Sequence, residues 1–370
     1  MKRLIKCFIV LLIPLIFTGC FNYEDINKVT FATSVIFDTD DFGNAVVYLD
    51  CIKSYRSTND SSDKGRRIIY KGVGKTALEA IRDVSVASSF KLNYSQSRAY
   101  IFTEKAARGS IKKYLDLINN NQQFQIKPSM FVYYGDVEDL LEITSGDEEY
   151  LGLYLNDLSH KNKYNPRAME ENIDEYLSNS LMGSNTNVVG AIQIRKDALD
   201  KKVEISGGAV MKDDILVKRI EAEDSLSYNF LINDVKGGTL EMANPQSSDG
   251  FITLEILESN TTSDIEYDGE NLNLIKNIDM RVSIGEAQGR LLVNKELLDY
   301  IKLTKEEEVK RYLSQVFEKY KEENLDIFNI ERLIEIKYPD KVIENPVSKT
   351  SLKLNVDLKI DGTGVVKNSL

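Results

Sequence analysis

Residues 352–360 read LKLNVDLKI, and this stretch decides the fold class of the C-terminal half. Leucine, valine and isoleucine occupy every second position, while lysine, asparagine and aspartate occupy the positions between them. Because successive side chains of a strand point to opposite faces of a sheet, the pattern predicts a strand with one buried and one solvated face. We expect antiparallel pairing, with helices covering the buried face.

A long amphipathic helix is predicted before this strand, over residues 305–323. Its apolar side chains recur at helical spacing, at Val309, Tyr312, Leu313, Val316 and Tyr320. Further strands are expected at residues 188–194, 203–211, 251–257, 278–284 and 290–293. These elements together predict a C-terminal α+β domain over residues 201–370, with an antiparallel sheet and the helix 305–323.

The N-terminal half alternates strands with helices. Residues 29–38 and 44–55 are rich in β-formers and are joined by a turn at 40–43. Helices are expected after Lys75 and over a segment with Ile111, Tyr114, Leu115 and Ile118 at helical spacing, and a strand at residues 130–134. We therefore predict an N-terminal α+β domain over residues 20–143.

The composition shifts after residue 143. Thr144 to Glu149 is small and acidic, and Ser178 to Asn187 is rich in serine and asparagine, with a helical stretch expected at residues 169–177. We interpret residues 144–200 as linkers around a small middle domain. The whole prediction is a multi-domain α+β ectodomain of mixed or antiparallel sheets flanked by helices.

The first residues have the layout of a secretion signal. Lys2, Arg3 and Lys6 give a basic start, and residues 8–17 then run almost without a polar side chain. A membrane-spanning helix needs about 20 apolar residues, so this run is too short to span and favours cleavage. The sequence predicts a signal peptide over residues 1–19.

A cysteine follows at the expected cleavage site. Phe17-Thr18-Gly19-Cys20 resembles the bacterial lipobox, whose cysteine receives diacylglycerol before the peptide is cut. Each buried CH₂ group of an acyl chain contributes about 0.8 kcal/mol, so lipid on Cys20 would hold a polar domain on the extracytoplasmic face of a membrane. The alternatives are an ordinary signal peptide or a short apolar anchor with an incidental cysteine.

Composition narrows the function classes. The precursor has 370 residues, of which 28% are charged, and its formal net charge is −11, which argues against a nucleic-acid-binding face. Cys7 would leave with the signal peptide and Cys20 would carry lipid, so Cys51 would be the one free thiol and no internal disulfide is expected. Cys51 lies in an apolar strand pattern and is predicted to be a small core residue.

Two segments imitate known binding motifs. Residues 72–76 read GVGKT, but a phosphate-binding loop needs glycine where Ile69 stands, so a helix start is the simpler interpretation. Asp38, Asp40 and Gly43 imitate a calcium loop, yet apolar residues occupy ligand positions after them, which indicates a turn.

The sequence predicts no catalytic residue, no cofactor site and no metal site. His160 is the one histidine, and it follows a polar segment, so solvent exposure is expected rather than a role as a catalytic base. Acidic clusters at residues 306–308 and 322–323 fall at helix ends and need no catalytic explanation. A pair of carboxylates brought together by folding, as in glycosidases, stays open.

Ordered motifs along the chain resemble the Ger(x)C lipoproteins, the C subunits of spore germinant receptors. The motifs are Tyr70 to Ile81, Leu92-Asn93-Tyr94, Ser97 to Phe102, Gly207 to Asp214, Asn324 to Phe328, Tyr338-Pro339 and a late strand ending in Gly362. They span nearly the whole expected mature chain in the family's order, behind the lipobox. Phe21-Asn22 stands where family members usually have tryptophan, which indicates a divergent member.

The resemblance implies a three-domain α+β ectodomain on the outer surface of the spore's inner membrane. It also implies a non-enzymatic receptor subunit that assembles with two integral membrane subunits, A and B, and responds to small nutrients. Two alternatives stay open: a substrate-binding lipoprotein of a transporter, which needs a ligand cleft between two lobes, and an envelope hydrolase.

Overall fold

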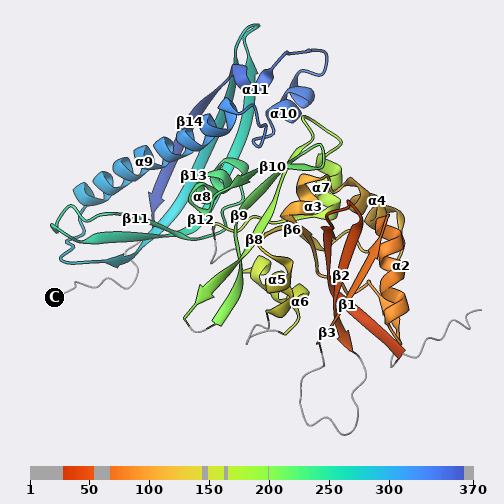
Figure 1. Ribbon diagram of the computed structural model, residues 1–370. Helices are drawn as coiled ribbons and strands as arrows, with labels where there is room; N and C mark the ends of the chain where they lie inside the picture. The colour runs from red at the N-terminus through yellow and green to blue at the C-terminus, as the bar shows by residue number, and fades with distance from the viewer. Residues whose placement is uncertain (1–27, 54–66, 144–148, 162–165, 199, 362–370) are drawn as a thin grey trace, which may run out of the picture.

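The computed structural model describes residues 28–53, 67–143, 149–161, 166–198 and 200–361. The predicted signal peptide and Cys20 therefore lie outside the described residues. Figure 1 shows two sheets, each with its own helices, joined through the segment that contains β8, β9 and β10. Among the helices of the described residues, none combines the length and apolar character needed to cross a membrane.

The first sheet contains ten strands within the described ranges, in the order β10-β9-β8-β6-β5-β1-β2-β3, with β4 beside β1 and β7 beside β6. Its central pairs β1-β5, β5-β6 and β6-β8 are parallel, and the outer pairs are antiparallel. The strands are β1 (Val29–Thr39), β2 (Ala45–Lys53), β3 (Arg67–Gly74), β4 (Lys91–Asn93), β5 (Ala99–Thr103), β6 (Ser129–Tyr134), β7 (Glu171–Asn172), β8 (Thr186–Asp197), β9 (Asp200–Lys212) and β10 (Ile215–Ile220).

Helices cover both faces of this sheet. One face packs against α2 (Ala77–Ala87), α3 (Glu104–Arg108), α4 (Lys112–Asn120) and α7 (Ile173–Asn179), and the other against α5 (Val137–Glu142) and α6 (Leu151–His160). Strand alternation separates the two cores: Tyr100 and Phe102 of β5 belong to the first, whereas Ile101 belongs to the second. The apolar face predicted around α4 is confirmed, because Ile111 and Ile118 are both buried there.

A buried ion pair joins the edge of this sheet to its second helical layer. The carboxylate of Asp50 on β2 is fully buried and accepts from Arg67 Nε of β3 at 2.9 Å and from the Leu151 N–H at 2.7 Å. Arg67 Nη1 also donates to the carbonyls of Leu141 at 3.1 Å and Ile143 at 2.7 Å. The pair thus connects two strands to the ends of α5 and α6.

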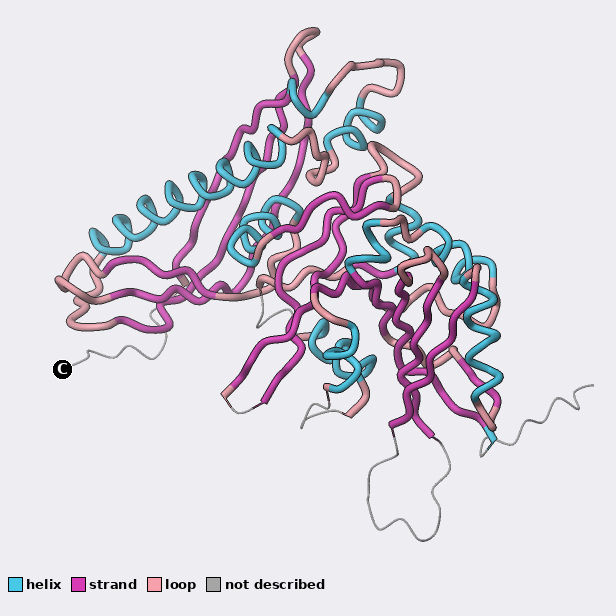
Figure 2. Tube along the Cα trace, in the orientation of Figure 1, coloured by secondary structure: helices cyan, strands magenta, loops and turns pink. Residues whose placement is uncertain are grey.

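The second sheet has the order β11-β12-β13-β14 in the described residues, and its helices lie on one face (Figure 2). Apolar side chains from α8, α9 and α10 share one core with alternate residues of β12, β13 and β14. The elements are α8 (Ala222–Ile232), β11 (Thr239–Ala243), β12 (Phe251–Tyr267), β13 (Leu272–Ala287), α9 (Lys295–Glu322), α10 (Ile330–Lys337), α11 (Pro346–Lys349) and β14 (Thr350–Ile360). The α+β class with mixed sheets flanked by helices is confirmed.

Strand β14 shows both a success and an error of the prediction. Its alternation is confirmed, with Val356 and Leu358 buried and Lys353 exposed. Its predicted antiparallel pairing is wrong, because β14 runs parallel to β13 from Leu272↔Thr350 to Val282↔Ile360. The connection between these strands passes through α9, α10 and α11, which is the kind of helical crossover that parallel neighbours require.

Two further expectations near α9 need correction. The helix begins at Lys295 rather than at residue 305, with Asn294 accepting from the Leu297 N–H at 2.8 Å, and Tyr312 lies on its exposed side. Residues 290–293 form no strand, because their backbone groups pair with side chains: Asn244 donates to the Arg290 carbonyl at 3.3 Å. The predicted domain boundaries at residues 143 and 200 stay predictions, and the first sheet continues across both positions.

The segment between α9 and α10 is held by a buried carboxylate. Asp326, in one of the motifs noted above, accepts from the Ile330 N–H at 2.7 Å and from the Glu331 N–H at 2.8 Å. These are free amides of the first turn of α10, so Asp326 caps the helix from outside it. The two hydrogen bonds hold the turn formed by residues 327–329, between Asp326 and the start of α10.

Candidate ligand cleft

A polar cleft of about 790 Å³ lies where the two parts of the chain meet. The first part contributes residues 95–98, 125–129 and 170–188, and the second contributes residues around 228–236 and 327–329. The cleft lies at the amino ends of β5, β6 and β8, next to its lining residues Ser97, Pro128 and Thr186. Nucleotide sites of doubly wound sheets lie at the opposite, carboxyl ends of the strands. Its volume falls in the range of small-molecule sites.

Glu171 of β7 lines this cleft and is a buried acidic side chain. It is only 7% exposed, and its Oε1 accepts from Asn179 Nδ2 at 2.8 Å. Asn179 Oδ1 accepts in turn from Arg332 Nη1 of α10 at 2.8 Å. Since arginine can only donate, it fixes the Asn179 amide with its NH₂ toward Glu171.

The second carboxyl oxygen of Glu171, Oε2, has no hydrogen-bond partner in the part of the chain that the structure describes. Burial raises the pKa of Glu171 from 4.5 to about 8, the Asn179 hydrogen bond lowers it, and the Glu175 charge raises it. At neutral pH the folded protein therefore holds Glu171 as a neutral acid.

The rest of the lining is rich in hydrogen-bonding groups. Glu170 accepts from Ser129 Oγ at 2.6 Å, and Asn187 donates to Ser180 Oγ at 2.9 Å. Asn172 and Glu175 form a capping box at the start of α7. These contacts hold the polar side chains of the cleft in place, which favours a preformed site.

Both acidic and basic side chains line the cleft. The lining acids Glu170, Glu171 and Asp234 are buried or half-buried, and Asp234 pairs with Lys236 at 3.3 Å. The lining cations Arg98, Lys127 and Lys236 are all exposed. The fourth lining acid, Glu175, is also exposed, so exposed groups of both signs line the cleft.

His160 lies at the rim of this cleft, at the end of α6. It is exposed, as predicted, and its Nδ1 lies 2.6 Å from the Asn156 carbonyl. Sequence reasoning missed Glu171, because residues 169–177 resemble one polar helix. The structure instead places Glu171 and Asn172 in β7 and begins α7 at Ile173.

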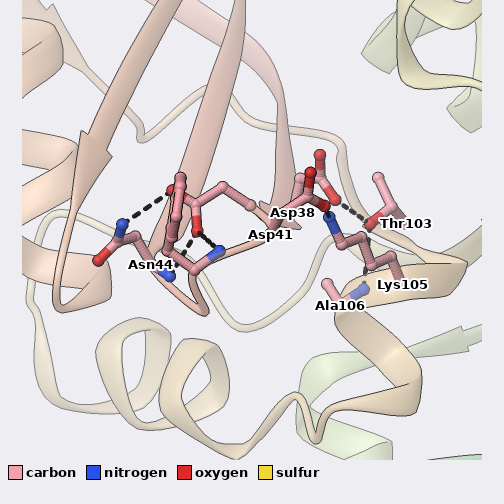
Figure 3. Close-up of polar contacts among 8 residues, drawn as sticks. Asp38, Asp41, Asn44, Thr103, Lys105 and Ala106 are labelled. Atoms are coloured by element: carbon pink, nitrogen blue, oxygen red, sulfur yellow. Dashed lines mark hydrogen bonds and ion pairs between the residues drawn. The ribbon is translucent and has the colours of Figure 1, made fainter.

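The predicted turn at residues 40–43 is confirmed (Figure 3). Asp40 accepts from the Phe42 N–H at 2.9 Å and from both the backbone and side-chain amides of Asn44 at 2.8 Å. Asp38 accepts a hydrogen bond from Thr103 Oγ1 at 2.5 Å, and Asp41 accepts one from Lys105 Nζ at 2.5 Å. Protein donors thus satisfy the carboxylates that imitate a calcium loop.

The GVGKT segment leads into a helix, as predicted, although its residues 72–74 are the end of β3 and α2 begins only after Thr76. Thr76 caps α2 by accepting from the Glu79 N–H at 3.1 Å. A Cβ on Gly72 would lie 2.2 Å from the Ala80 carbonyl oxygen, and one on Gly74 would lie 2.5 Å from the Ala80 nitrogen. The glycines therefore serve the close packing of β3 on α2.

Other predicted positions are simple to place. Cys51 is a fully buried free thiol, as expected for a core residue, and burial raises its pKa. Cys20, the predicted lipid attachment residue, lies outside the described residues. Within the described ranges, no group of three or more histidine, cysteine, aspartate or glutamate side chains is arranged to hold a metal ion.

Comparisons with known proteins agree with one another over almost the full length. The family of spore germination protein N-terminal domains matches residues 22–194, and the family described as "Spore germination B3/GerAC like, C-terminal" matches residues 206–364. The chain is 21% identical over 371 residues to the spore germination protein GerQC of Bacillus cereus, covering 99% of this chain and 100% of that protein.

A solved structure supports the same fold. The crystal structure of the GerBC protein matches with a TM-score of 0.54 at 15% identity, covering 92% of this chain and 100% of that chain. At this identity the likeness concerns the fold alone. These matches do not favour the transporter or hydrolase alternatives. With both family domains matched in order and the fold shared, the chain belongs to the Ger(x)C family of spore germination proteins.

Proposed function

We propose that this chain is a lipid-anchored, non-enzymatic subunit of a nutrient germinant receptor that takes part in triggering spore germination. The observation that carries the proposal is the serial match to the two domains of spore germination proteins over residues 22–194 and 206–364. The similarity to GerQC, a spore germination protein, over 99% of this chain also supports it.

The anchor in this proposal is lipid on Cys20, after removal of residues 1–19. The match to the N-terminal family begins at residue 22, two residues after that cysteine, so the matched domain lies entirely behind the proposed attachment residue. We place the protein on the extracytoplasmic face of the spore's inner membrane. Its proposed partners there are the integral membrane A and B subunits of the receptor.

Deletion of the gene tests the receptor role. We expect slower germination with specific nutrients and normal germination with agents that bypass nutrient receptors. Normal germination of the deleted strain with every nutrient tested would refute the role. Co-purification from spore membranes should recover the two integral subunits, and recovery of neither would count against the assembly.

A cysteine substitution tests the anchor separately. Cys20→Ala should abolish incorporation of labelled palmitate and release the protein from the membrane fraction, whereas Cys7→Ala, in the predicted signal peptide, should change neither. Unlipidated Cys20→Ala protein that stays in the membrane fraction would overturn the anchor.

A further inference from the structure

We propose that a groove between α2 and α4 binds an anionic phospholipid of the membrane to which the chain is anchored. This site rests on the proposed function, since the lipid on Cys20 is what brings the groove to the membrane. The lining of the groove, the charges on α2 and the length of chain between the groove and Cys20 support it.

The groove has a volume of about 1180 Å³ and shares no lining residue with the polar cleft described above. Its lining residues fall within residues 75–85, 90–94 and 113–123, which belong to α2, β4, α4 and the segments beside them. Helix α2 lies at the end of the molecule that is farthest from the second sheet (Figure 1). The groove is therefore a separate site on the first part of the chain.

Apolar side chains form part of the groove's surface. Ile81, Leu92 and Leu117 are buried beneath it. Leu78 is 41% exposed and Phe90 is half-buried, so both present apolar surface to the groove. Removing such surface from water is favourable, and a ligand with an apolar portion can do so, whereas a free phosphate ion cannot.

Basic side chains outnumber acidic ones in the lining. The cations are Lys75, Arg82, Lys91 and Lys113, and Asp116 is the one acid among the described lining residues. The chain as a whole has a formal net charge of −11, so the groove is opposite in sign to the molecule that carries it. An anionic ligand is favoured there, because it meets a local excess of positive charge.

The acidic side chains of α2 are engaged away from the groove, beside β3. Asp83 accepts from the Val73 N–H at 2.9 Å, and Glu79 accepts from the Lys75 N–H at 2.7 Å. Neither carboxylate lines the groove, whereas Arg82 of the same helix does. Helix α2 therefore presents its cation, and not its acids, to a ligand in the groove.

The length of chain before β1 identifies the occupant. Lys28 is the eighth residue after Cys20, and an extended chain spans at most about 3.6 Å per residue, so Lys28 lies within about 29 Å of the lipidated residue. The next residue, Val29, pairs with Lys91 of β4, which lines the groove. The anchor thus holds the groove near a surface where phospholipid has a high effective concentration. A soluble acidic protein has no such advantage.

A dye placed in the groove of the full lipid-modified chain tests this site. With Cys7 removed and Cys20 lipidated, the buried Cys51 is the remaining native thiol, so a dye couples selectively to an introduced exposed cysteine. Ser85→Cys places the dye in the groove lining, and Ser314→Cys places it on the exposed side of α9 as the matched control. The anchored chains are compared in vesicles of phosphatidylcholine alone and in vesicles that also contain phosphatidylglycerol. Both kinds of vesicle carry a lipid with a nitroxide quencher at its headgroup.

We expect quenching of the dye at residue 85 to be at least about twofold stronger when phosphatidylglycerol is present. Raising the salt from about 0.1 M to about 1 M should weaken this preference, because the Debye length falls from about 10 Å to about 3 Å. The dye at residue 314 should respond equally to both kinds of vesicle. Inorganic phosphate at constant ionic strength should leave the quenching at residue 85 unchanged.

A charge reversal tests the cations of the groove. Arg82→Glu should remove the preference for phosphatidylglycerol, whereas Arg311→Glu, which changes an exposed arginine of α9, should keep it. Unchanged preference in folded Arg82→Glu would overturn the proposal. Loss of quenching on addition of inorganic phosphate would also overturn it, because the site would then take the free anion.

The vesicle comparison separates this site from the anchor. Anchored protein with equal quenching at residue 85 in both kinds of vesicle would overturn the lipid site and leave the anchor intact, and an acidic protein as the occupant would give this result. Wild-type chain that binds neither kind of vesicle would overturn the anchor and the lipid site together. None of these outcomes depends on the germination phenotype of the deleted strain.

Discussion

The raised pKa of Glu171 makes a quantitative prediction about stability. In the folded protein burial raises this pKa to about 8, whereas its ordinary value is 4.5. Between these values the folded state keeps the proton and the unfolded state loses it, so the free energy of unfolding falls as pH rises through this window. Each pH unit inside it costs about 1.4 kcal/mol, and the full window about 5 kcal/mol as an upper limit.

Glu171→Gln removes this pH dependence, because glutamine cannot ionise and has nearly the shape of the neutral acid. We expect the variant and the wild type to unfold at similar urea concentrations near pH 5. Near pH 8.5 the variant should be more stable than the wild type by about 3–5 kcal/mol. Between pH 4.5 and 8 the unfolded wild type loses the Glu171 proton while the folded wild type keeps it, and this difference lowers the free energy of unfolding of the wild type alone. The comparison cancels the titration of every other group that both proteins share.

The control for this experiment is Glu318→Gln, whose side chain is half-exposed and paired with Lys321 at 3.2 Å. Its stability should follow the wild type within a few tenths of a kcal/mol at both pH values. Parallel pH profiles for Glu171→Gln and the wild type would refute the reasoning, because they would mean that Glu171 has the same pKa in both states.

Three further substitutions test the packing and polar contacts of the two sheets. Gly72→Ala forces a Cβ into the backbone of α2 and should lower the free energy of unfolding by about 1–3 kcal/mol. In the control Gly109→Ala the new Cβ meets nothing closer than 3.7 Å, so the loss should be smaller. Equal losses for the two variants in urea unfolding would refute the close approach of β3 to α2. Arg67→Met leaves the Asp50 charge buried without its partner and should lower the free energy of unfolding by about 3–5 kcal/mol. The double variant that also carries Asp50→Leu should recover part of this stability. No recovery in the double variant would contradict the ion-pair account. Asp326→Ala removes the two hydrogen bonds that cap α10 and should lower the free energy of unfolding by about 2 kcal/mol. Amide hydrogen exchange in α10 should become faster. Unchanged exchange in this helix would argue against the cap.

Local pattern was enough to predict several features of this chain. The alternation at residues 352–360, the turn at 40–43 and the buried face around Ile111 depend on the period of a strand or helix and on turn chemistry, which neighbouring residues encode. The order of short motifs likewise indicated the family that the comparisons then showed.

What the sequence determined by itself was therefore the alternation of apolar and polar faces, the helix start at Thr76 and the family. Tertiary structure alone decided the parallel pairing of β14, because pairing direction depends on the path of the crossover through α9, α10 and α11. It also decided the cleft, which joins segments near residues 98, 171, 234 and 327. The raised pKa of Glu171 arises there, because distant segments remove its carboxyl group from water.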